Sequence, residues 1–171
     1  SVWLGNLGNV FLRLGQTDKE SEFDNEGLKL ARGLQDRHSE AAHLDTLGDC
    51  LLSKGQYKEA LEHYTSALEI GQSIADKIGE RIYLSNVARA YKRLGEMDKA
   101  ITCFSDAIEI FDEQRSRINA DSLKTSFAAT GQSLYRDTIH ACLEAGRRVE
   151  ALEYVGRAKS RAILDLLRNS P

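Results

Sequence analysis

Three glycines recur at one fixed interval in this chain: Gly15, Gly55 and Gly95 lie 40 residues apart. Each separates two amphipathic stretches, as in GDCLLSKGQYKEALEHY at 48–64 and ARAYKRLGEMDKAITCF at 88–104. A period of this length indicates a repeat architecture, in which each repeat is a helical hairpin that cannot bury its apolar face alone. Neighbouring hairpins must therefore stack, and at least three are needed for a continuous core.

The residues before each glycine predict a helix and the face that it buries. Apolar residues recur there at i, i+3 and i+7, which places them on one helical face. The aligned sets are Leu4, Leu44 and Leu84; Leu7, Leu47 and Val87; and Phe11, Leu51 and Tyr91. A small residue stands on the same face at Gly8, Gly48 and Ala88. Glycine inside a helix costs about 1 kcal/mol relative to alanine, so we expect a neighbour that approaches too closely for a side chain.

Composition agrees with an all-helical chain. The only proline is the last residue, Pro171, so none interrupts a helix. No stretch approaches the roughly 20 apolar residues that cross a bilayer, and the first residues lack the features of a signal peptide. We therefore expect a cytoplasmic protein with no membrane partner, and we expect its three cysteines to be reduced.

The combined pattern resembles tetratricopeptide repeats. The resemblance rests on the small residue, the LG pair, the aromatic residue late in the first helix, the turn glycine, and the second helices KEALEHYTSALEI and DKAITCFSDAIEI. The period differs from the usual one of about 34 residues, and is similar to that of a longer variety found in regulatory scaffolds. The resemblance implies an all-α fold: a right-handed superhelical stack of antiparallel helical hairpins, that is, an α-solenoid.

We expect a single domain over residues 1–171, with repeats at about 1–38, 39–78, 79–118 and a degenerate, lengthened unit at 119–168. The first repeat departs from the next two at three positions. Glu20, Asp24 and Gly27 stand where the others have Ala60 and Ala100, Tyr64 and Phe104, and Ala67 and Ala107. Its second helix is therefore expected to pack loosely or to cap the stack.

The fourth unit appears only when an insertion is allowed. Gly146 serves as its turn glycine, 51 residues after Gly95. Its first helix is therefore expected to be lengthened, from about 122 to 145. Ile139 replaces the small residue, Ala151 and Ala158 take the small positions of the second helix, and Val155 takes the aromatic position. The packing of the fourth unit against the third must therefore differ from the packing between the earlier units.

Residues 121–168 carry a second resemblance. The segments LKTSF, EAL and RAKSRAILDLL are similar to the last repeat and exit helix of bacterial and archaeal proteins in which tetratricopeptide repeats precede a CHAT domain, a caspase-like cysteine protease. The resemblance implies a regulatory or sensing piece of a larger protein, whose protease domain would follow Pro171. Residues 146–171 also carry a net charge of +3 in a chain of net charge −3. Either an acidic partner or ordinary helix-end cations would explain this asymmetry.

The polar face of the first helices is the candidate binding surface. Tetratricopeptide scaffolds line a concave groove with these helices, so the resemblance implies a bound peptide or partner protein, held by amide and cationic side chains. The alternative is a merely solvated polar face. The candidate residues are Asn6, Asn9, Arg13, Asp45, Asp49, Asn86, Arg89, Lys92 and Arg93.

Catalysis finds little support in the sequence. His63 and Cys103 share one position of the repeat and could form a nucleophile pair, but both adjoin core aromatic residues, so core packing is expected. No dinucleotide, Walker or H-E-x-x-H motif occurs, and neither a cofactor nor a metal is expected.

Two other functions are alternatives to a binding scaffold: an autonomous enzyme and an RNA-binding helical repeat. Asp45 and Asp49 interrupt the basic face that RNA would require, so no nucleic-acid partner is expected. A homodimer through the end repeats is a further possibility, since end repeats expose apolar surface.

Overall fold

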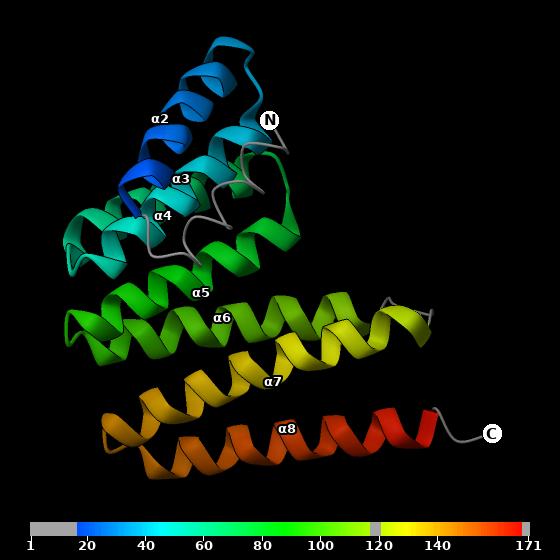
Figure 1. Cartoon of the computed structure of the whole chain (residues 1–171). Helices are drawn as coiled ribbons and strands as arrows, with labels where there is room; N and C mark the ends of the chain where they lie inside the picture. The colour runs from blue at the N-terminus through cyan, green and yellow to red at the C-terminus, as the bar shows by residue number, and fades with distance from the viewer. Residues whose placement is uncertain (1–16, 117–120, 169–171) are drawn as a thin grey trace. The chain divides into compact units, whose positions relative to one another are not determined.

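The computed structural model describes the backbone of residues 17–116 and 121–168, and the side chains of 21–115 and 131–160. Seven α-helices and no strand occur in these ranges (Figure 1). They are α2 (Thr17–Gly33), α3 (Arg37–Ser53), α4 (Tyr57–Ser73), α5 (Lys77–Arg93), α6 (Met97–Ser116), α7 (Asp121–Glu144) and α8 (Arg148–Arg168). The all-α fold of antiparallel hairpins is therefore confirmed. The helix predicted before Gly15 lies outside the described residues.

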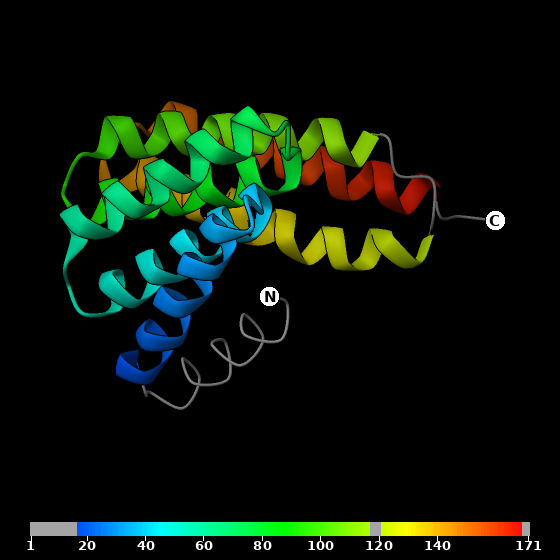
Figure 2. The ribbon, with the colours of Figure 1, turned by 90° about the horizontal axis from the view of Figure 1, so that it is seen from above.

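The helices form two compact units, one up to Gly95 and one from Glu96 onward. In the first unit each helix packs on the next, and α3 also contacts α5. Figure 2 shows this unit from above, with α2 in blue beside α3 in cyan. In the second unit α7 lies between α6 and α8. The expected single domain with four repeats stays a prediction.

Glycines end the first helices where the sequence predicts. Gly55, Gly95 and Gly146 adopt φ values of +79°, +79° and +74°, in the left-handed region that glycine enters without steric cost. Different residues make the turns between hairpins, where Asp36 and Asp76 cap α3 and α5 by accepting backbone N–H groups. The sequence thus specifies both ends of these helices locally.

The predicted close approach at Gly48 is confirmed. A Cβ atom added there would lie 2.6 Å from Cε1 of Tyr64, whose ring is fully buried. Ala88 at the equivalent position is also fully buried. In both hairpins the small residue is therefore part of the packed interior.

The second helix of the first repeat packs more closely than expected. Asp24 is buried on α2, and its Oδ1 lies 2.8 Å from Nδ1 of His43 on α3. One turn further along α2, a Cβ added to Gly27 would overlap the ring of His43. This contact is not loosely packed, because a polar pair replaces the aromatic residue of the other repeats, and the role of α2 as a cap of the stack stays a prediction.

The fourth unit keeps its turn but changes its contacts. Helix α7 runs from Asp121 to Glu144, within one residue of the expected range. Ile139 is half-buried, whereas Thr138 beside it is fully buried and donates its hydroxyl to the Leu134 carbonyl. On α8, Tyr154 is buried and Val155 only half-buried, so the buried aromatic position is one residue earlier than expected.

Candidate partner-binding site

Four of the predicted binding residues meet between α3 and α5. The Asn86 side chain donates to Oδ1 of Asp45 at 2.6 Å, and Nη2 of Arg89 lies 3.2 Å from Oδ1 of Asp49. Arg89 also donates to the Asn86 side-chain oxygen, which joins the two contacts into one network. We call these residues, together with Tyr64 of α4, the α3–α5 cluster.

Tyr64 is the member of the cluster that sequence reasoning missed. Its hydroxyl donates to Oδ1 of Asp49 at 2.6 Å, while its ring covers Gly48. The repeat pattern predicts that Tyr64, which aligns with Phe104, belongs to the core, and its ring is indeed buried. The phenolic oxygen, which phenylalanine lacks, was the available signal for its second contact.

The cluster is less solvated than the sequence suggests. Asn86 is only 6% exposed, so its amide acts inside the helix packing. The Asp49 and Arg89 side chains are 33% and 45% exposed and remain accessible. Lys92 is half-buried and Arg93 exposed, further along α5. The remaining candidates, Asn6, Asn9 and Arg13, lie outside the described residues.

Burial shifts the pKa values of two groups in the cluster, the Asp45 carboxyl and the Tyr64 hydroxyl. Burial raises the pKa of Asp45 from 3.8 to about 7, and the neighbouring Asp49 carboxylate adds to the rise, against the opposing effects of Asn86 and Arg89. Burial and Asp49 also raise the pKa of Tyr64, which keeps its proton as a donor. At neutral pH the folded protein therefore holds Asp45 in an unfavourable, partly ionised state.

This state predicts a pH-dependent effect of Asp45→Asn. Because the pKa of Asp45 is higher in the folded state than in the unfolded state, this residue contributes stability in full below about pH 4. That contribution is lost as the pH rises through about 7. The neutral amide avoids that loss, so the variant should exceed the parent in free energy of unfolding by at least about 1 kcal/mol at pH 8. Urea unfolding at pH 4 and pH 8 checks this. A difference that does not shrink toward pH 4 would show that Asp45 is not the titrating group.

The cysteine and histidine candidates lack the properties of an activated nucleophile. Burial raises the pKa of the Cys103 thiol, which disfavours its reactive thiolate. Burial also lowers the pKa of His63. Cys142 is fully buried, and burial raises its pKa too. Within the described residues, no three metal-ligating side chains come together, and no helix there is long and apolar enough to cross a membrane.

Residues 34–113 match the family model of the tetratricopeptide repeat. This part of the chain is therefore similar to tetratricopeptide repeats. The matched region includes α3, α4, α5 and most of α6, and thus the whole α3–α5 cluster. No curated protein matches the sequence at a significant level.

Solved structures share the fold of this chain. BtubC (BKLC) from P. vanneervenii is 20% identical, with a TM-score of 0.77 over 95% of this chain and 63% of its own. The TPR domain of Arabidopsis FLU is 25% identical, with a TM-score of 0.61 over 66% of this chain and 94% of its own. A Rap protein complexed with competence and sporulation factor is 19% identical, with a TM-score of 0.78 over 94% of this chain. The chain spans only 42% of the Rap protein.

Proposed function

We propose that the chain is a protein-interaction scaffold that binds a peptide or partner protein at the α3–α5 cluster. The observation that carries the proposal is the placement of Asp45, Asp49, Asn86 and Arg89 between the first helices of successive hairpins. Replacing buried polar networks by apolar residues is often neutral or stabilising, so stability alone gives little reason for this one. Positions that break the packing rule are the places where function is expected.

The geometry allows Arg89 and Asp49 to exchange their mutual contact for contacts with a ligand. The Arg89–Asp49 distance of 3.2 Å is longer than a strong charge-assisted hydrogen bond, which spans about 2.7–2.9 Å. Both side chains are accessible, so a ligand carboxylate can compete for Arg89 while a ligand N–H group bonds Asp49. The Rap structure is a complex with competence and sporulation factor, and this supports a binding role for a protein of this fold.

The proposal extends to the larger protein. The likeness of residues 121–168 to segments that precede CHAT domains supports a regulatory role, in which partner binding in the cytoplasm controls a downstream protease. The reading frame after Pro171 tests this part independently of the cluster. A homodimer through end repeats is the other assembly that we predict, and sedimentation of the chain would detect it.

Replacing both Arg89 and Lys92 with alanine should weaken binding of a partner about tenfold or more. One hydrogen bond to a charged group contributes about 1.5–3 kcal/mol, and about 1.4 kcal/mol corresponds to a factor of ten. The ligand is an acidic peptide chosen from a random library by binding to the unaltered chain, and calorimetry gives the affinities.

The matched control removes two exposed cations from the second helices. Lys29 on α2 and Lys58 on α4 are exposed, and Lys29→Ala/Lys58→Ala changes the net charge equally. The control should bind as the parent does. If both double variants lose affinity equally, long-range charge and not the cluster accounts for binding.

A further inference from the structure

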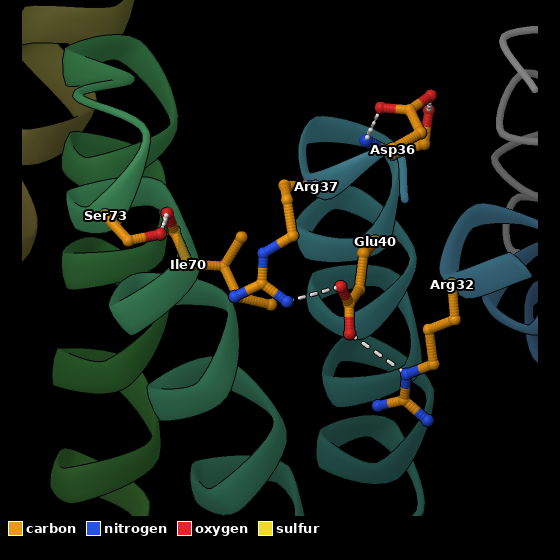
Figure 3. A network of polar contacts seen from close by, with 7 residues as sticks. Arg32, Asp36, Arg37, Glu40, Ile70 and Ser73 are labelled. Atoms are coloured by element: carbon orange, nitrogen blue, oxygen red, sulfur yellow. Dashed lines mark hydrogen bonds and ion pairs between the residues drawn. The ribbon is translucent and has the colours of Figure 1, made fainter. Parts of the chain in front are cut away.

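A second polar site lies where α2 turns into α3, away from the α3–α5 cluster. It is a hollow lined by Arg32, Gln35, Arg37 and Glu40. Nε of Arg32 donates to Oε1 of Glu40 at 2.9 Å, and Nη1 of Arg37 donates to Oε2 at 2.7 Å. Figure 3 shows the single Glu40 carboxylate between the two guanidinium groups.

The next repeat forms the same junction with one positive charge fewer. Forty residues on, the side-chain amide of Gln72 donates to Glu80 at 3.2 Å, and Nζ of Lys77 lies 2.7 Å from the other oxygen of Glu80. The same junction between hairpins is therefore held by one cation and one amide. Arg32 supplies a second positive charge that this structural role does not require.

Asp36, the N-cap residue of α3, does not pair with the extra charge. The Asp36 carboxylate accepts the backbone N–H of Ser39 at 3.0 Å and its hydroxyl at 2.6 Å, and it points away from the guanidinium groups in Figure 3. The Arg32 and Arg37 side chains are 58% and 50% exposed, whereas Glu40 is only 10% exposed. Two accessible cations thus share one buried anion.

We propose that this hollow binds a phosphate group through Arg32 and Arg37, with the Gln35 amide as an additional donor. A guanidinium has five N–H donors, and the bond to Glu40 leaves most of them on each arginine available. A phosphate monoester offers three acceptor oxygens and nearly two negative charges, whereas a carboxylate offers two oxygens and one charge. The phosphate therefore suits a pair of guanidinium groups better.

His63 of α4 provides a reporter close to the hollow. Burial lowers its pKa, and the Arg32 guanidinium lowers it further against the opposing effect of Glu62. A phosphate bound to Arg32 would offset that positive charge. The His63 pKa, followed by NMR, should therefore rise when phosphate binds.

The test titrates the whole chain with inorganic phosphate at constant ionic strength, with acetate as the carboxylate comparison. NMR shifts at Gln35 and Arg37 should saturate with phosphate, and phosphate should bind more tightly than acetate. Arg32→Gln recreates the junction of the next repeat, so it should keep thermal stability while weakening phosphate binding about tenfold or more. Saturation by acetate at equal affinity, or unaltered phosphate binding by Arg32→Gln, would overturn the proposal.

A converse variant, which changes the junction between α4 and α5, tests whether these residues are sufficient to create a phosphate site. Gln72→Arg/Ala75→Gln/Lys77→Arg gives the second junction the residues of the first, and it should add a second phosphate site with shifts at Glu80. A peptide carrying one phosphoserine distinguishes the two sources of the group. Tighter binding than inorganic phosphate indicates a phosphorylated partner, and equal binding indicates free phosphate. A converse variant that gains no site would show that two arginines at this junction are insufficient.

Discussion

Replacing His43 with leucine is expected to lower the free energy of unfolding by about 3–5 kcal/mol, the cost of leaving a buried charge without its partner. Asp24 is only 1% exposed, and its Oδ2 has no hydrogen-bond partner among the described residues. The contact between Oδ1 and His43 therefore offsets the burial of the whole carboxylate. Urea unfolding followed by helical circular dichroism at neutral pH measures the loss.

A double-mutant cycle separates this contact from the packing of the imidazole ring. Asp24→Ala alone should cost about 1–3 kcal/mol, because it leaves the ring nitrogen unpaired. The double variant Asp24→Ala/His43→Leu buries neither an unpaired charge nor an unpaired nitrogen. Its cost should fall well below the sum of the single costs, with a coupling of up to about 3 kcal/mol. Strictly additive costs would mean that the two side chains stabilise the protein independently.

Local chemistry made the hairpins predictable. Gly55, Gly95 and Gly146 mark left-handed turn positions, and Gly48 with Ala88 marks a close approach, because each of these constraints acts on a single residue. Period and apolar spacing then determine which faces must meet. These signals are sufficient for helix order and for most of the core.

The site was less predictable because its contacts join residues from different helices. Asn86 has a polar side chain on a nominally exposed face, yet Asp45, 41 residues earlier, accepts its hydrogen bond in the packed region. Asp24 resembles a defect in the repeat pattern because the periodicity does not identify His43 as its hydrogen-bond partner. Periodicity identifies which faces are buried, but it does not report pairs of polar groups that satisfy each other within them.

Replacing Gly48 with leucine should both destabilise the first unit and disturb the α3–α5 cluster. The new Cβ would lie 2.6 Å from the Tyr64 ring, which is fully buried and held by its hydrogen bond to Asp49. Overpacking of this kind costs about 1–3 kcal/mol and exceeds the gain of at most about 1 kcal/mol from removing a helical glycine. Thermal unfolding should show the loss, and the selected acidic peptide should bind more weakly because Tyr64 can no longer position Asp49.

Gly156→Leu is the matched control, since Gly156 is also a helical glycine but is exposed on α8, with no described atom within 4 Å of its added Cβ. That substitution should leave peptide affinity unchanged and raise stability by up to about 1 kcal/mol. The contrast isolates steric crowding, because both variants gain the same helix propensity. If Gly48→Leu were as stable as Gly156→Leu, the Tyr64 ring would have to move without cost. The buried tyrosine could then not be what holds Asp49 toward Arg89.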